Sequence, residues 1–146
     1  MTNGQVRGQN LVIVKALTYL MFAMFAMTTD SVGVIIPEVI RRYALGMTAG
    51  GAFQYATMSG IAIAAFGLGF LADRWGRKRS IVAGLLLFAA SSALFAVGRE
   101  FLTFVVLLFV SGVAIGVFKA GALALIGDIS RSTREHSSTM NMLEGF

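Results

Sequence analysis

Apolar residues dominate this 146-residue chain in four long runs separated by short polar segments. The runs cover about 11–36, 49–72, 80–98 and 101–127. Each is long enough for a helix that crosses a hydrocarbon core of ~30 Å, which takes about 20 residues. Because lipid-exposed backbone must satisfy its own hydrogen bonds, the short connections predict neighbouring antiparallel helices. The pattern therefore predicts an all-α, polytopic membrane helix bundle, a single transmembrane domain over residues 1–146.

Local signals set the predicted ends of these spans. The first span is expected to end at Pro37, because proline lacks the N–H that continues a helix. Thr48 is the predicted N-cap of the second span. Residues 128–146 are predicted to form a cytoplasmic loop followed by the start of a fifth span, since apolar residues return from Met140 onward.

The composition agrees with a membrane protein. Hydrophobic residues make up 57% of the chain and charged residues 13%, against about 45–50% and about 25% in soluble domains. So few polar residues could not cover the surface of a soluble fold. The net charge of +5 comes from cations at the ends of apolar runs, which indicates membrane topology and not nucleic-acid binding. The lipid bilayer is the expected partner.

The distribution of lysine and arginine predicts the orientation. Eight cations fall on one side of the membrane: Arg7, Lys15, Arg74, Arg77, Lys78, Arg79, Arg131 and Arg134. Three fall on the other: Arg41, Arg42 and Arg99. Since positive loops stay inside, the N-terminus, the loop after the second span and the C-terminal tail are expected in the cytoplasm. The predicted location is the bacterial inner (plasma) membrane.

The segment Gly69–Arg79, which reads Gly-Phe-Leu-Ala-Asp-Arg-Trp-Gly-Arg-Lys-Arg, follows the second span. Gly76 makes a sharp turn with positive φ available at little cost, and Gly69 permits a close helix–helix approach. Asp73 is predicted at a helix C-terminus, where the macrodipole disfavours a carboxylate by ~0.3–1 kcal/mol. Arg77, four residues on, offsets that cost.

Asp128 meets the same problem at the end of the fourth span, with Arg131 three residues on. A positive-inside anchor alone would explain the cations of this loop. It would not explain two acids at unfavourable helix ends.

The segment resembles the signature loop between spans two and three of the major facilitator superfamily, Gly-x-Leu-Ala-Asp-Arg-x-Gly-Arg-Lys/Arg. The resemblance implies a secondary transporter that works by alternating access, with twelve spans in two halves. The chain would then be an N-terminal fragment of about four spans, an incomplete half that needs the missing C-terminal part. Leu108 departs from the arginine that many proton-coupled drug exporters carry in span four, which weakens an assignment as a drug exporter.

The resemblance also implies a gate. The counterpart of Arg77 pairs with an acid at the end of span four, here Asp128, and the counterpart of Asp73 faces a helix N-terminus of the other half. The gating motif comprises Gly69, Asp73, Arg74, Gly76, Arg77, Lys78, Arg79 and Asp128.

Ionisable groups within spans are costly and mark candidate cavity residues. Lys119 either snorkels to the cytoplasmic interface or lines a cavity that attracts an anionic solute. Asp30, seven residues before Pro37, is either interfacial or binds a proton or cation. Gln54 and Tyr55 in the second span are further candidates for hydrogen bonds to a solute.

Two glycines in the fourth span, Gly112 and Gly116, form a GxxxG step that lets another helix approach closely. This interpretation is structural and assigns no solute contact to them.

The sequence contains no P-loop, no nucleophile–base pair and no metal-ligand spacing. We therefore expect a non-enzyme without a cofactor or metal. Two alternatives stay open: a non-transporting four-span scaffold or assembly subunit, and a small four-span transporter that acts as a dimer.

Overall fold

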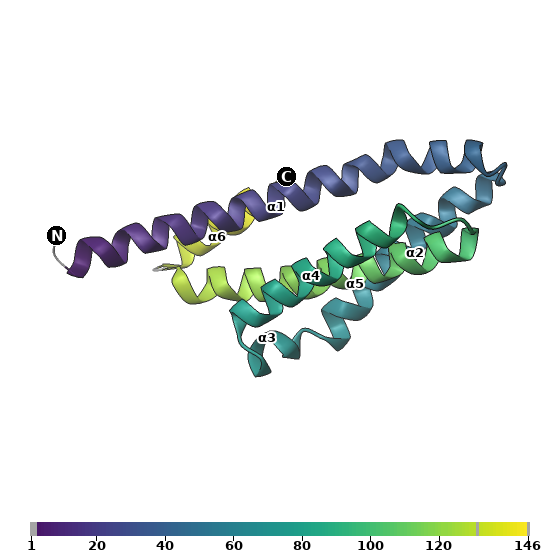
Figure 1. Cartoon of the computed structure of the whole chain (residues 1–146). Coiled ribbons are helices and arrows are strands. Elements are labelled where there is room, and N and C mark those ends of the chain that lie inside the picture. Colours follow the sequence, from purple (N-terminus) through teal and green to yellow (C-terminus); the bar gives the residue numbers. More distant parts are fainter. Residues whose placement is uncertain (1–2, 131, 146) are drawn as a thin grey trace. The chain divides into compact units, whose positions relative to one another are not determined.

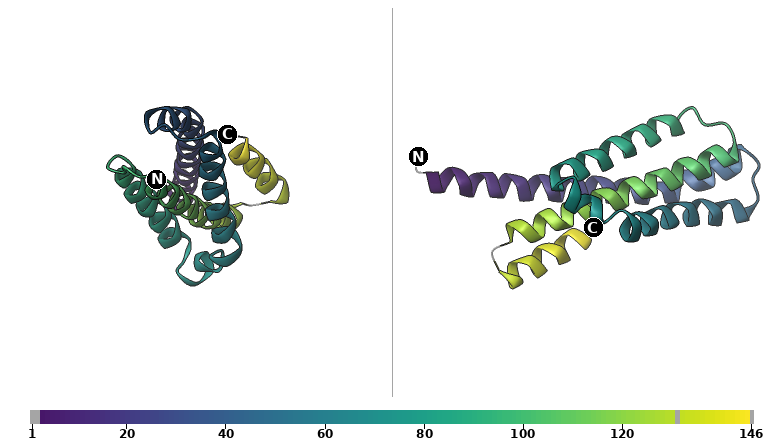
Figure 2. Two further views of the ribbon diagram at one scale, coloured as in Figure 1. Left: turned by 90° about the vertical axis from the view of Figure 1, so that its right-hand side faces the viewer. Right: turned by 90° about the horizontal axis from the view of Figure 1, so that it is seen from below.

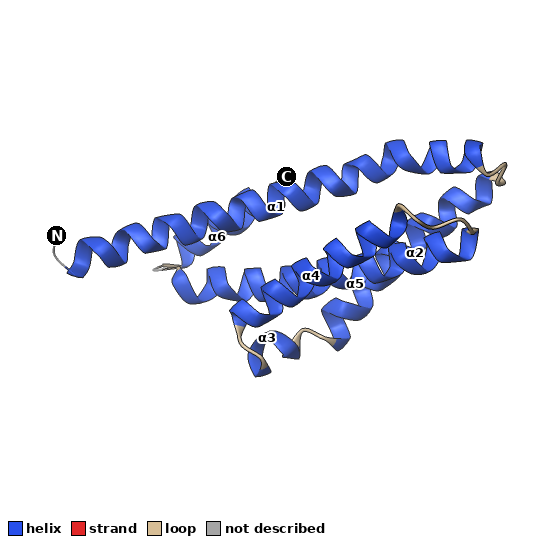
Figure 3. Ribbon diagram, viewed as in Figure 1, coloured by secondary structure: helices blue, strands red, loops and turns tan. Residues whose placement is uncertain are grey.

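The computed structural model describes residues 3–130 and 132–145, so Arg131 lies outside the described residues (Figure 1). Within this range the chain forms helices and no strands, as Figure 3 shows, which confirms the predicted all-α class. The helices are α1 (Asn3–Arg42), α2 (Met47–Gly67), α3 (Phe70–Arg74), α4 (Arg77–Phe95), α5 (Phe101–Ile129) and α6 (Thr133–Glu144).

The chain divides into two compact units. The larger unit is Val32–Ala124 and contains the end of α1, helices α2, α3 and α4, and most of α5. The smaller unit joins Met1–Ser31 with Leu125–Phe146. Each unit is described on its own.

The first helix was predicted to end at Pro37. This prediction is wrong, because α1 continues to Arg42. Proline inside a membrane helix is tolerated where the surroundings compensate for the lost hydrogen bond. The extra turn is favoured by its charges: Arg41 and Arg42 lie at the negative end of the helix dipole. Arg41 also donates to both carboxylate oxygens of Glu38, at 2.8–3.1 Å.

Helix α2 differs from the predicted second span at both ends. Its N-cap is the extended Gly46 and not Thr48, which lies within the first turn. The helix ends at Gly67, and the predicted continuation to residue 72 is a separate short helix, α3. Two glycines, Gly67 and Gly69, flank the break, and each costs a helix ~1 kcal/mol relative to alanine.

Helix α5 packs against α2 in the larger unit through backbone contact. A Cβ on Gly112 would overlap the carbonyl of Thr57 and lie 3.2 Å from the Cα of Gly60. One on Gly116 would lie 2.5 Å from the Cβ of Ala64. The predicted close approach at this GxxxG step is confirmed, and α2 is the helix that makes it.

Helix α4 packs on another face of α5, so α5 lies between α2 and α4 (Figure 2, right). A Cβ on Gly84 would lie 2.8 Å from the backbone nitrogen of Phe118. The hydroxyls of Ser91 and Ser111 share a 2.8 Å hydrogen bond between the two helices. Since lipid supplies no hydrophobic drive between helices, such close packing and interhelical bonding hold them together.

An aromatic cluster closes the end of the larger unit at which α5 begins. Phe53 and Phe104 are buried, and partly buried residues of α1 and α4 pack against them. The rings of Phe95 and Phe104 lie 4.8 Å apart, and Tyr43 meets Phe104 edge-on at 5.5 Å. The cluster joins the ends of α1 and α4 to the start of α5.

The smaller unit contains α6, which begins within the predicted cytoplasmic loop. Ser132 caps it by accepting a hydrogen bond from the backbone N–H of Glu135 at 3.2 Å. This Ser-x-x-Glu cap stabilises a helix start, and so residues from 133 on are helical and not a loop. Glu135 also pairs with Lys15 of α1, a cation predicted only to mark the cytoplasmic side.

Among the described residues, α4 and α5 are the helices long and apolar enough by themselves to cross a membrane. A shorter apolar stretch, Leu11–Met27, lies in α1. Membrane crossing by α1 and α2 stays a prediction.

The contact between α2 and α5 predicts the effect of a methyl group at its centre. Gly112→Ala forces the backbones apart and is expected to destabilise the fold by about 1–3 kcal/mol, the usual cost of overpacking. Unfolding of the purified chain in mixed micelles, followed by circular dichroism, measures it. Gly33→Ala is the matched control, because a Cβ there meets nothing within 4 Å. Equal stabilities of the two variants would contradict the assigned contact.

Candidate functional site

The signature segment is a helix–turn–helix in the larger unit. Helix α3 ends at Arg74, and α4 begins at Arg77, so only Trp75 and Gly76 connect them. The predicted loop 73–79 is therefore mostly helical. Gly76 has φ 87° and ψ 149°, a region essentially restricted to glycine. The predicted positive φ at this residue is confirmed.

Asp73 and Arg77 face each other across this turn. The Arg77 guanidinium donates to the Asp73 carboxylate at 2.5 Å. The Asp73 side chain is 73% exposed and that of Arg77 28%. Exposed ion pairs contribute only about 0.2–1 kcal/mol to the stability of a fold. The Asp73–Arg77 pair therefore favours this conformation of the turn only weakly.

The pair relieves an electrostatic conflict at the start of α4. Arg77, Lys78 and Arg79 occupy the positive end of α4, whose first turn has no acidic residue, and this arrangement opposes the helix dipole. Asp73 precedes Arg74, the last residue of the short helix α3, and its carboxylate brings a negative charge across the turn. The conflict was not predicted, because the third span was expected to begin at Ser80 and not at Arg77.

Two small residues flank the turn. Gly69 lies in the break between α2 and α3, where a Cβ would approach only the Ala65 carbonyl of the preceding helix, at 3.0 Å. Among the described residues no other helix comes within 4 Å of a Cβ at this position, and the close approach to another helix at Gly69 stays a prediction. Ser80 is fully buried, and its Cβ would lie 3.1 Å from one built on Gly121 of α5.

Other residues of the motif add to the surface. Arg74 lies over the ring of Phe70, 6.0 Å from its centroid.

Asp128 is exposed and next to last in α5. It belongs to the smaller unit and Arg77 to the larger. The pairing of Asp128 with Arg77 stays a prediction.

The candidate cavity residues lie on three helices. Lys119 is half-buried in α5, and Gln54 and Tyr55 are exposed on α2. Asp30 is exposed and lies twelve residues before Arg42, the end of α1. Because α1 continues past Pro37, Asp30 lies within the helix and not in its last turns. Their roles toward a solute stay predictions.

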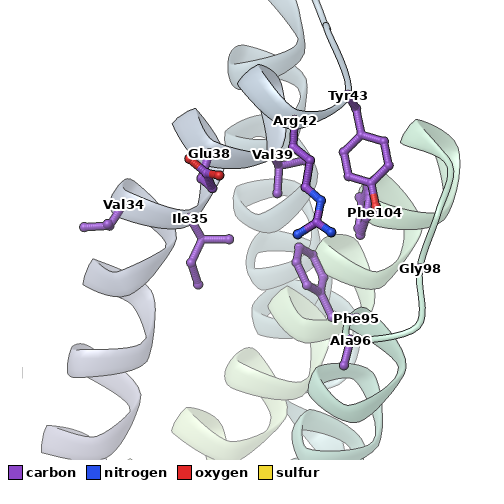
Figure 4. A pocket seen from close by; sticks show the side chains of 10 residues that line it. All are labelled: Val34, Ile35, Glu38, Val39, Arg42, Tyr43, Phe95, Ala96, Gly98 and Phe104. Atoms are coloured by element: carbon purple, nitrogen blue, oxygen red, sulfur yellow. The ribbon is translucent and has the colours of Figure 1, made fainter.

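A pocket of about 420 Å³, which was not predicted from the sequence, lies at the opposite end of the larger unit (Figure 4). It is lined by Val34, Ile35, Glu38, Val39, Arg42, Tyr43, Phe95, Ala96, Gly98 and Phe104. These residues come from α1, the end of α4 and the start of α5. No local pattern links positions so far apart in the chain. The cations at 41 and 42 were the only available signal, and they were attributed to topology.

Closely packed apolar helices joined by short turns are typical of helical membrane proteins. Residues 18–146 match the Major Facilitator Superfamily, and the chain belongs to this family. The resemblance found in the signature segment is thereby confirmed.

Two relatives illustrate the range of the family. Over 75 residues, 51% of this chain, the sequence is 40% identical to the quinolone resistance protein NorA of Staphylococcus aureus and covers 19% of it. Over 130 residues, 89% of this chain, it is 26% identical to the 4-hydroxybenzoate transporter PcaK of Pseudomonas putida and covers 29%. The chain thus spans less than a third of either relative. No solved structure matches it.

The backbone at Gly76 predicts strain in any substituted side chain. Gly76→Ala is expected to cost about 1–3 kcal/mol, the usual price of a non-glycine residue in this region of φ and ψ. Equilibrium unfolding of the chain in detergent measures the loss. Gly67→Ala is the control, since a Cβ there meets nothing within 4 Å. A Gly76→Ala variant as stable as the control would show that the turn is not held in this conformation.

Proposed function

We propose that the chain forms part of an alternating-access secondary transporter, in which Gly69–Arg79 is the cytoplasmic gate. The Asp73–Arg77 ion pair across the Gly76 turn is the observation that carries the proposal. It connects the two charged helix ends of a segment that matches the family signature. The remaining spans come from the rest of the transporter, which resides in a bacterial plasma membrane with the N-terminus in the cytoplasm.

The weakness of the ion pair suits a gate. A gate must exchange partners as the transporter alternates between outward-open and inward-open states. An exposed pair of about 0.2–1 kcal/mol can be broken and remade at little cost. Arg77 is proposed to contact Asp128 in the outward-open state, while Asp73 faces a helix N-terminus of the other half. These contacts together close the cytoplasmic side.

The transported solute is proposed to be an organic anion. Lys119 supplies a cation within α5, the most apolar helix of the larger unit. A charge inside a membrane helix is retained at a cost and marks a functional position. The relative PcaK is named for 4-hydroxybenzoate, an aromatic carboxylate, which supports this class. Asp30 is proposed to bind a coupling proton or cation, and Gln54 and Tyr55 to hydrogen-bond the solute.

A four-span scaffold and a dimeric four-span transporter are the alternatives. Each could use the close packing of α2, α4 and α5. Neither requires a glycine-only turn with paired charges. No observation favours either of them over the gate.

Arg77→Ala in the complete transporter is expected to shift the balance toward the inward-open state. The loss of a pair worth about 0.2–1 kcal/mol changes the ratio of the two states ~1.4- to 5-fold. Single cysteines introduced on the cytoplasmic side of a transporter without other cysteines report the accessibility of that side, and proteoliposome uptake reports the rate.

The control for this experiment is Arg99→Ala, which removes an exposed cation outside the signature segment. Arg77→Lys keeps the positive charge and should retain part of the outward-open population. An Arg77→Ala transporter with unchanged accessibility and rate would refute the gate.

Lys119→Gln is expected to raise the KM for a benzoate-type carboxylate about tenfold or more, since hydrogen bonds to charged groups contribute about 1.5–3 kcal/mol. Lys119→Arg should retain uptake, and Arg99→Gln controls for the loss of one positive charge. Unchanged uptake by Lys119→Gln in proteoliposomes would exclude Lys119 from the solute cavity.

A further inference from the structure

The pocket between α1, α4 and α5 lies at one end of the larger unit. Its walls include the last three turns of α1, the end of α4 and Phe104 in the first turn of α5. The signature turn lies at the other end of α4. Between Arg77 and Phe95 the helical rise gives ~27 Å, close to the ~30 Å thickness of a hydrocarbon core. The pocket is therefore at the level where lipid headgroups meet the hydrocarbon.

Two charged side chains, Glu38 and Arg42, line the pocket, and Glu38 already forms an ion pair. Glu38 accepts bidentate hydrogen bonds from Arg41 at 2.8–3.1 Å. Arg42 has no ion pair within the part of the chain that the structure describes. Figure 4 shows its guanidinium extending from α1 into the pocket. The charge of Arg42 is thus available to an external anion.

The rest of the lining is mostly apolar and extends from Arg42 along α1. Val34 is 77% exposed and Ile35 44%, and both lie toward the hydrocarbon from Arg42 along α1. Seven residues separate Ile35 from Arg42, about 10 Å of helical rise. Phe95 and Phe104 form the opposite wall. A cationic group at one end with an apolar track leading from it is complementary to an anionic amphiphile.

We propose that this pocket binds an anionic phospholipid, with the phosphate on Arg42 and an acyl chain along Val34 and Ile35. Arginine forms paired hydrogen bonds with phosphate oxygens. Tyr43, an aromatic residue with a polar tip, lines the pocket beside Arg42, as is typical of side chains at the membrane interface. The site is independent of the proposed gate, which lies at the other end of α4.

Native mass spectrometry of the full chain in an uncharged detergent tests the site. Dioleoyl phosphatidylglycerol is the anionic probe, and dioleoyl phosphatidylcholine the zwitterionic one. We expect phosphatidylglycerol to bind preferentially and Arg42→Gln to weaken it about five-fold, the contribution of one basic residue at a membrane surface. Free glycerol phosphate at equal concentration should not displace the lipid; displacement would assign the site to a soluble phosphate.

Two further variants make the test decisive. Arg99→Gln removes a cation at the same end of the unit that does not line the pocket, and it should bind phosphatidylglycerol normally. Ala96→Trp fills the pocket without changing its charge and should weaken binding, even if Arg42→Gln fails to fold. Equal binding of both lipids, equal losses in Arg42→Gln and Arg99→Gln, or unimpaired binding by Ala96→Trp would each overturn the proposal.

Discussion

The backbone contact between α2 and α5 is the constraint on which the larger unit depends. At Gly60 and Gly112 the two helices approach so closely that neither position has room for a Cβ. Apolar side chains gain nothing from leaving lipid for another apolar surface, so helices in a membrane associate through such close packing. Helix α5 meets α4 in the same way at Gly84. With α5 fixed on two sides, the signature turn and the pocket lie at opposite ends of one rigid group of helices.

Charge at the start of α4 runs against the helix dipole, and this conflict is informative. A segment selected only for stability would place acids at the start of α4. Here three cations begin α4, and the nearest acid is Asp73, on the other side of the Gly76 turn. The Asp73–Arg77 pair reduces the cost without removing it, because two further cations remain in the first turn. An exposed pair of this kind is weak enough to be exchanged for other partners, which is the property that the proposed gate uses.

The all-α fold and the turn at Gly76 could be predicted because each follows from a local signal. The length of the apolar runs predicts the helices, and a glycine between charged residues predicts the turn. The end of α1 was not predictable by the same rules. Pro37 is a stop signal in water, but Arg41 and Arg42 favour a further turn at the negative end of the helix dipole. The break at Gly67–Gly69 was missed because the apolar run continues through it. The pocket joins residues from 34 to 104, and its existence depends on tertiary packing that no periodicity encodes.

Local pairing on a helix decides which charges remain for other molecules. Glu38 lies within one helical turn of both Arg41 and Arg42 and pairs with Arg41. Arg42 lines the pocket beside Glu38 and keeps its charge for another partner. At the signature turn Asp73 pairs with Arg77, which leaves Lys78 and Arg79 on the exposed start of α4. Side chains three or four residues apart share a helix face, so an acid within reach of two cations pairs with one of them and leaves the other for a different molecule.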